Sequence, residues 1–147
     1  MKKDALISRK GLQRTDDPDS EEVTLVTEGR FYRKGNGYHI RYEESELTGF
    51  ADTTTFVSVR PDMVTVNRSG KHPSMMTFEK GQRHMSLYNT QFGSLTITMA
   101  TKNIESSFND NGGKLVVEYD IEVQHAWLST NTLSIEVECK GPDLDEK

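Results

Sequence analysis

Cysteine, proline and long apolar runs are the scarce features of this 147-residue sequence. It contains one cysteine, four prolines and one tryptophan, and its mean hydropathy is −0.68. One cysteine cannot form an internal disulfide, and residues 1–9 lack the apolar stretch of a secretory signal, so we expect a cytoplasmic protein. No apolar run reaches the roughly 20 residues that a bilayer-crossing helix needs, so we expect no membrane partner.

Basic residues are also fewer than acidic ones. The sequence has 18 lysine and arginine residues against 23 aspartate and glutamate residues, which gives a formal net charge of −5 at pH 7. A protein of net negative charge is not attracted to the phosphates of nucleic acid, so we expect no nucleic-acid partner. Many of the acidic residues near the C-terminus alternate with apolar ones, which is typical of solvent-facing strand positions.

Metal-binding and nucleotide-binding spacings are missing as well. The four histidines are scattered along the chain, and no Cys-x-x-Cys or His-Glu-x-x-His pattern occurs. No Gly-x-x-x-x-Gly-Lys-Ser/Thr sequence is present to hold a phosphate group. We therefore expect neither a metal nor a cofactor.

Alternation of apolar and polar residues is the dominant pattern that the sequence does have. It runs from about residue 22 to residue 139, and no helical spacing of apolar residues is sustained. In Leu115–Val123 and in Leu133–Cys139 the apolar residues alternate with carboxylates, so a slip of one residue would bury those charges. We predict a single all-β domain over residues 1–147, in which residues 141–147 form a flexible acidic tail.

Turn sequences rich in glycine, asparagine and proline recur about every ten residues and separate the expected strands. Segment 22–34 is longer than an ordinary strand, and Gly29 in its middle suggests a bend. An open sheet of this size would expose two long edges, so we predict a closed antiparallel barrel of eight to ten strands. The expected strands are 4–13, 22–34, 38–44, 53–60, 63–68, 74–79, 82–90, 93–104, 114–124 and 132–140.

Five strings occur along the chain in a characteristic order: Glu28–Glu44, Phe78–His84, Tyr88–Gly93, Thr101–Ile104 and Gly112–Tyr119. In this order and spacing they resemble the YwiB-like family of small, uncharacterised bacterial proteins. The resemblance implies a calycin-type, lipocalin-like meander barrel from a bacterial cytoplasm, and it carries no established activity, substrate or cofactor. The Gly-x-Trp signature of true lipocalins is missing, since the one tryptophan is Trp127.

Alternate residues of the predicted strands would line the inside of the barrel. A small barrel is filled by its own side chains, whereas a slightly wider one leaves room for a ligand. Tyr42 and Tyr119 are of interest because a buried phenol needs a hydrogen-bond partner, which the polar group of a ligand can supply. The candidate ligand-binding residues are Tyr42, Phe78, Met85, Met99 and Tyr119.

A second candidate site is polar. If Lys80-Gly81 forms a two-residue turn, the hairpin around it gathers Glu79, His84 and Tyr88 on one face. A carboxylate beside an imidazole, with a phenol nearby, can orient a general base. An ordinary hydrogen-bonded strand face fits the same pattern, so we predict no catalytic residue.

The function we favour from the sequence is a non-enzymatic barrel that binds a small apolar or amphipathic molecule in its lumen. One alternative is a protein–protein interaction module with a filled interior, which docks through a strand face or through its acidic C-terminal region. Another is an undiscovered enzyme that uses His84 and Glu79. An inner cavity that opens at one end of the barrel would favour the first function over the second.

Overall fold

The computed structural model describes residues 1–16, 21–45, 51–71, 73–90, 93–142 and 144, and of residues 21 and 87–90 it describes the backbone alone. The described chain forms ten antiparallel strands, which confirms the predicted all-β class. No helix among the described residues is long and apolar enough to cross a membrane. The strands are β1 (Lys2–Arg14), β2 (Glu21–Lys34), β3 (Gly37–Glu43), β4 (Thr53–Val59), β5 (Met63–Gly70), β6 (Ser74–Glu79), β7 (Arg83–Thr90), β8 (Gly93–Asn109), β9 (Gly112–Val123) and β10 (Ala126–Lys140).

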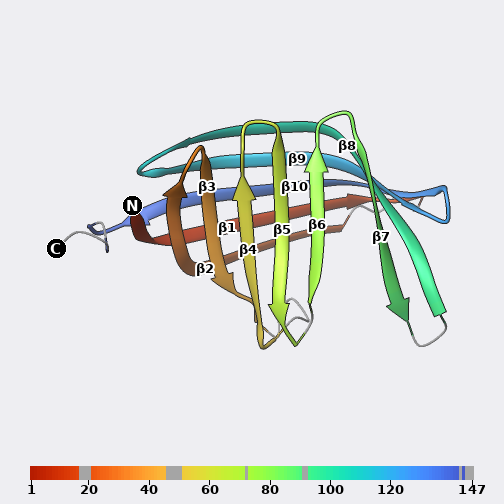
Figure 1. Ribbon diagram of the computed structural model, residues 1–147, viewed down its shortest axis with the longest axis horizontal. Coiled ribbons are helices and arrows are strands. Elements are labelled where there is room, and N and C mark those ends of the chain that lie inside the picture. Colours follow the sequence, from red (N-terminus) through yellow and green to blue (C-terminus); the bar gives the residue numbers. More distant parts are fainter. Residues whose placement is uncertain (17–20, 46–50, 72, 91–92, 143, 145–147) are drawn as a thin grey trace.

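All ten strands belong to one sheet, whose order is β6-β5-β4-β3-β2-β1-β10-β9-β8-β7. Strands that follow one another in the sequence are therefore neighbours, except β6 and β7, and β1 also pairs with β10, from Asp4 opposite Lys140 to Arg14 opposite Thr130. This pairing joins the first strand to the last and curls the sheet into a nearly closed barrel (Figure 1). The predicted antiparallel barrel is confirmed. Strands β6 and β7, the two edges of the sheet, are not paired with each other, and we call the gap between them the seam.

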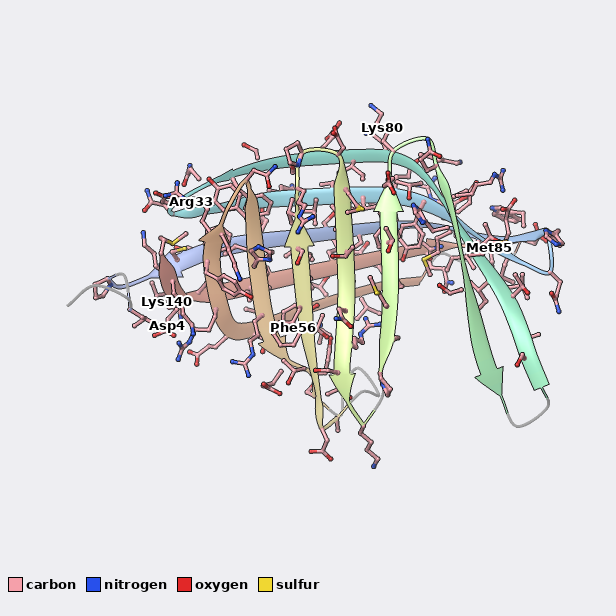
Figure 2. The ribbon with its side chains drawn as sticks, viewed as in Figure 1. Asp4, Arg33, Phe56, Lys80, Met85 and Lys140 are labelled. Atoms are coloured by element: carbon pink, nitrogen blue, oxygen red, sulfur yellow. The ribbon has the colours of Figure 1, made fainter. Side chains whose placement is uncertain are left out.

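The seam arises because β7 is held by β8. The N–H of Gly81 donates to the carbonyl of Thr101 at 2.9 Å, and the N–H of Thr101 donates to the carbonyl of Gln82 at 3.1 Å. These bonds extend the β7–β8 ladder into the turn, where Lys80 points away from the barrel, and β7 diverges from β6 beyond it (Figures 1 and 2). The prediction of a β6–β7 hairpin is therefore wrong, although the turn itself closes through Gln82 N–H and Glu79 O at 2.9 Å.

The hydrophobic core lies on the inner face of the barrel. Leu115 pairs with Ile135 and Val117 pairs with Leu133, as the alternation predicts, while Glu136 on the opposite face is exposed. Burying these aliphatic side chains stabilises the fold by about 25 cal/mol per Å² of apolar surface. The buried apolar residues are Ala5, Ile7, Phe31, Ile40, Tyr42, Val57, Val59, Val64, Val66, Phe78, Met99, Leu115, Val117, Ile135 and Val137.

Strands β8 and β10 exceed their predicted lengths the most, by five and six residues, and each contains a bulge. Strand β8 continues to Asn109 past an irregularity between Thr101 and Asn103, and β10 begins at Ala126, ahead of another between Trp127 and Ser129. A bulge adds one residue to one strand and shifts which residues face inward. The simple alternation ends there, which is why pattern-based bounds stopped at residue 104 and started at residue 132.

The C-terminal segment continues from β10. Residues 143 and 145–147 of the predicted acidic tail lie outside the described residues, so the prediction of flexibility is not addressed there. The N–H of Leu144, which is described, donates to the carbonyl of Lys2 at 2.7 Å. Leu144 thus lies beside the beginning of β1, at the end of the barrel where β1 starts (Figure 1).

Candidate functional site

An aromatic stack crosses the barrel at the end where β1 begins. Phe31 on β2 stacks on Tyr38 of β3 with ring centroids 5.5 Å apart, and Phe108 of β8 lies 5.8 Å from Phe31 and 5.7 Å from Tyr38. Phe108 comes from a strand that is not a sheet neighbour of β2 or β3, so the stack crosses the interior. A ligand in the lumen would therefore have to lie toward the opposite end.

Farther along the inner face, a group of polar side chains is buried among the apolar ones. It consists of Arg9 on β1, Tyr42 on β3, Glu44 just after β3, Thr55 on β4 and Arg68 on β5, and we name it the inner polar cluster. The side chain of Glu44 is 1% exposed, that of Arg9 12% and that of Arg68 19%. Buried charges are costly without partners, so the contacts within the cluster decide whether it is stable.

Glu44 is the centre of the inner polar cluster. Arg9 Nη1 donates to both of its carboxylate oxygens, at 3.1 Å and 3.3 Å, and Thr55 Oγ1 donates to Oε1 at 2.7 Å. Arg68 Nε lies 3.9 Å from Oε1, within ion-pair distance. The negative charge of Glu44 is therefore shared between two guanidinium groups inside the barrel.

Arg9 packs against an aromatic ring, and its buried Nε–H has no hydrogen-bond partner among the described residues. Its Cζ atom lies 4.2 Å from the centroid of the Tyr42 ring, which is a cation–π contact. Burial raises the pKa of Tyr42, and the charge of Arg9 opposes this rise. Among the described residues, the buried Nε atom of Arg9 has no hydrogen-bond partner. A buried donor without an acceptor costs about 1–3 kcal/mol, so this N–H is a place where an acceptor would be stabilising.

Around Gly11, the next inward position after Arg9 on β1, lies a hollow of about 230 Å³ that Arg9 itself does not line. It is formed by β1, β2, β9 and β10, and a Cβ atom built on Gly11 would meet nothing within 4 Å. Val23, opposite Gly11, is 58% exposed, so the hollow opens to solvent. We name it the Gly11 hollow; its inner-face residues are Gly11, Gln13, Val23, Tyr119, Asn131 and Leu133.

The structure places the five predicted ligand-binding residues in four different surroundings. Tyr42 belongs to the inner polar cluster and Tyr119 to the Gly11 hollow, while Phe78 and Met99 are core residues. Phe78 packs on Tyr119 across the interior, with ring centroids 4.6 Å apart. Met85 does not line the interior, contrary to the prediction: its strand partner is Thr98, and its side chain is 67% exposed on β7 (Figure 2).

The predicted polar site is brought together in part. His84 Nε2 lies 2.9 Å from Glu79 Oε1, so the pair forms even though β6 and β7 are not laddered. His84 is paired with the core residue Met99, so its side chain lies on the inner face of β7. The sequence had predicted Met85 on that face and His84 on the opposite one. The side chain of Tyr88 lies outside the described residues. Both members of the His84–Glu79 pair are about one-third exposed, at 34% and 39%.

The charged members of the inner polar cluster and the Gly11 hollow were not predicted from the sequence. Their signal was present, because Arg9 continues the inner series of Ala5 and Ile7, and Glu44 and Arg68 likewise continue apolar series on their strands. A charged residue in phase with buried ones is the pattern that would have found them. Among the described residues, no group of three histidine, cysteine, aspartate or glutamate side chains could hold a metal ion.

The fold and its interior define a ten-stranded antiparallel β-barrel protein with a buried arginine–glutamate cluster beside an open hollow. A family model described as "Domain of unknown function (DUF1934)" matches residues 7–135, and the chain belongs to this family. It is 31% identical over 108 residues to the "Uncharacterized beta-barrel protein YwiB" of Bacillus subtilis (strain 168), covering 74% of this chain and 75% of that protein. The "Crystal structure of ywiB protein from Bacillus subtilis" is similar in fold, with a TM-score of 0.80 and 26% identity, over 95% of this chain and 94% of that one. The resemblance to the YwiB-like family is thereby confirmed.

Proposed function

We propose that this protein is a non-enzymatic, calycin-type barrel of the bacterial cytoplasm that binds a small amphipathic molecule at the open end of its interior. The observation that carries the proposal is the Gly11 hollow, which lies on the inner face of the barrel. Binding sites for small molecules are concave, largely apolar and supplied with a few fixed polar groups. The inner face of this barrel has this character, because it carries apolar side chains together with a few buried charged ones.

The lining of the Gly11 hollow suits a ligand with both apolar and polar parts. Leu133, Val23 and the ring of Tyr119 offer apolar surface, while the buried Asn131 and its neighbour Gln13 offer amide groups. The hollow is smaller than the 300–1,000 Å³ typical of sites for drug-sized molecules. The ligand is therefore a small molecule, and it enters from the end that the aromatic stack leaves open.

A substitution at Gly11 tests this function directly. The structure predicts that Gly11→Leu fills the hollow without a clash, since a Cβ at this position meets open space. Octan-1-ol, a small amphipathic probe, would be titrated into the full chain by calorimetry, with Gly11→Ala as the matched control. We expect binding to the original chain and to Gly11→Ala, and its loss in Gly11→Leu. Absence of binding to the original chain, or equal binding to all three, would overturn the proposal.

An interaction module is the second candidate function, and one observation favours it. Met75 on β6 and Met85 on β7 are 59% and 67% exposed on the two strands that border the seam. Exposed apolar side chains on strands that each have one unpaired edge are typical of sites where a partner adds a strand. Under this function the Gly11→Leu variant retains all binding to its partner, whereas Met85→Lys weakens it.

An enzyme is the third candidate, supported by the contact between His84 and Glu79. A carboxylate that orients an imidazole is a common arrangement for a general base. If the pair is catalytic, His84→Ala abolishes any turnover that a screen of ester substrates detects in the original chain. Turnover that is unchanged in His84→Ala would eliminate this candidate.

A further inference from the structure

We propose that the ligand of the Gly11 hollow is a neutral molecule with an amide group, whose N–H donates to Asn131 Oδ1 and whose carbonyl accepts from Gln13 Nε2. The inference rests on the proposed function and names the chemical class of its ligand. It is carried by the fixed orientation of the Asn131 side chain, by the free hydrogen-bonding groups of these two residues, and by the lack of charge in the described lining of the hollow.

The side-chain amide of Asn131 is held in one orientation by a buried neighbour. Asn131 is 8% exposed, and its Nδ2 group donates to Oγ of the fully buried Ser129 at 2.9 Å. This bond engages the donor end of the amide, so the oxygen Oδ1 lies at the end turned away from Ser129. Among the described residues, Oδ1 has no hydrogen-bond partner.

The free oxygen of Asn131 is accessible from the hollow. The buried side-chain atoms that lack a partner in the described part of the chain do not include Oδ1 of Asn131. Since this oxygen has no partner, it has surface that solvent reaches, and the hollow is the space that Asn131 lines. The hollow therefore presents an acceptor of fixed position, which a ligand with an N–H donor satisfies.

Gln13 supplies the complementary group. It lies on β1 directly opposite Asn131 and lines the same hollow. Residues opposite each other on antiparallel strands have Cβ atoms about 4.5–5.5 Å apart. The amide of Gln13 has no hydrogen bond to any described residue, so its Nε2 donor is available beside the Asn131 acceptor. A donor next to an acceptor matches the carbonyl and the N–H of one amide group.

The hollow gives no support to a charged ligand. Its described lining consists of glycine, leucine, valine, tyrosine, threonine, glutamine and asparagine, without an acidic or basic side chain. A charged group that leaves water without a counter-charge pays a large desolvation cost, whereas a neutral amide needs only its hydrogen bonds replaced. Leu133 and Val23 offer apolar contact to the rest of the molecule. The chemistry of the lining therefore points to a small lactam or carboxamide rather than to an acid or an amine.

The test compares three seven-membered ring compounds of nearly equal size. Caprolactam carries the amide, cycloheptanone keeps the carbonyl but has no N–H, and azepane is a ring amine that is positively charged at pH 7. Each would be titrated into the ¹⁵N-labelled full chain, and NMR chemical shifts give the dissociation constant and the residues affected. Octan-1-ol is titrated in parallel as the probe of the binding function itself.

Three variants assign the roles of the two side chains. Asn131→Leu removes the acceptor, Gln13→Met removes the donor at similar size, and Asn67→Leu is the matched control because Asn67 is exposed on the outer face of β5. If Asn131→Leu does not fold, Ser129→Ala/Asn131→Leu takes its place. The double variant removes both ends of the buried hydrogen bond and leaves neither unpaired.

We expect the original chain and Asn67→Leu to bind caprolactam about three- to tenfold more tightly than cycloheptanone, which is the effect of one neutral hydrogen bond. Azepane should bind more weakly than either. Asn131→Leu should bind caprolactam and cycloheptanone alike, because neither finds the acceptor. Gln13→Met should weaken both, because each presents a carbonyl.

The contrary outcomes separate the two proposals. Octan-1-ol binding without a preference for caprolactam over cycloheptanone overturns the amide inference and leaves the binding function standing. Azepane binding as tightly as caprolactam overturns the neutral class. A preference that survives in Asn131→Leu or in the double variant overturns the role of Asn131, and unchanged binding to Gln13→Met overturns that of Gln13. Caprolactam binding that persists in Gly11→Leu overturns the assignment to the hollow. Failure of all four compounds to bind overturns the proposed function itself.

Discussion

The carboxylate of Glu44 is held inside the barrel by groups from three different strands. Arg9 comes from β1, Thr55 from β4 and Arg68 from β5, so Glu44 ties together parts of the sheet that are not all neighbours. A buried ion pair adds little net stability relative to apolar residues, but removing one partner leaves the other charge without compensation. At the scale of single residues, this carboxylate is where we expect the greatest sensitivity.

Glu44→Gln tests that sensitivity. Loss of the negative charge leaves the buried guanidinium of Arg9 without its anion, and we expect the free energy of unfolding to fall by about 3 kcal/mol. The control is Glu43→Gln, the next residue along the chain, whose side chain is 66% exposed and pairs with Arg41 on the outer face. Urea denaturation followed by circular dichroism measures both, and a loss below about 1 kcal/mol for Glu44→Gln would contradict the assigned role.

Strand β2 shows how one small residue governs an element. It pairs with β1 along nearly its whole length but with β3 only from Gly29 to Lys34, so Gly29 marks the point at which the third strand joins. A Cβ atom at this position would overlap the carbonyl oxygen of Arg41 and the side chain of Ile7. The sequence suggested a bend at Gly29, and the structure assigns the residue to a close approach of three strands.

Gly29→Ala should therefore destabilise the protein, by about 1–3 kcal/mol, since overpacked sites force backbone shifts of this cost. Gly11→Ala is its matched control on β1, where the added methyl group meets no atom within 4 Å. At that position the loss of glycine's extra freedom in the unfolded chain should raise stability by about 0.4–1 kcal/mol. Thermal melting of the two variants should move in opposite directions, and equal shifts would refute the packing argument.

Strand β3 carries a titratable group on its outer face. His39 Nδ1 lies 3.0 Å from Ser58 Oγ, and its ring stacks on Tyr32 with centroids 5.0 Å apart. Burial lowers the pKa of His39 below 6.5, and the positive charge of Arg60 lowers it further. The folded chain therefore takes up a proton less readily than the unfolded chain does.

A depressed histidine pKa makes folding less favourable in mild acid. The contribution of His39 is fully present above pH 6.5 and is lost as the pH falls through the window between 6.5 and its lower folded-state pKa. We expect His39→Gln to reduce the drop in unfolding free energy between pH 7.5 and pH 5.5, measured by urea denaturation. His125→Asn, in the β9–β10 turn, should keep the original drop. An unchanged drop in His39→Gln would show that other groups set the pH dependence.

At the scale of the whole molecule, the sheet is closed by its first and last strands and left open at β6 and β7. Strand β1 is paired on both sides, with β2 and β10, whereas β6 pairs with β5 alone and β7 with β8 alone among the described strands. Backbone groups at a free edge are open to water and exchange their hydrogens without global unfolding. The seam is thus the place where we expect the barrel to open first.

Amide hydrogen exchange followed by mass spectrometry checks this expectation. Peptides from β1 and β10 should exchange at a rate limited by global unfolding, and peptides from β7 should exchange at least tenfold faster. Binding of a ligand in the Gly11 hollow should slow exchange in β1 and β10 more than in β7. Protection of β7 equal to that of β1 would mean that the seam is paired in solution, contrary to the structure.

Much of this architecture follows from the sequence alone. Alternation fixes the inner face of β9 and β10, since the opposite register would bury the carboxylates beside Val117 and Ile135. Turn residues fix where most strands end, and the ten observed strands fall within the predicted range of eight to ten. The same reasoning failed at Met85 and at the ends of β8 and β10. At these places the seam and two bulges determine which side chains face inward, and neither feature can be recognised from the nearby sequence.

The tertiary structure decided what lies inside. Arg9, Glu44 and Arg68 are far apart in the sequence and meet only because β1, β3, β4 and β5 curve around one interior. The room over Gly11 likewise depends on which side chains the curved sheet brings opposite it. A periodic pattern records which face of a strand avoids water, but the distance across a barrel is a property of its curvature. The sequence therefore determined a barrel with one dry face, and only the fold decided that this face also holds a charged cluster and an open hollow.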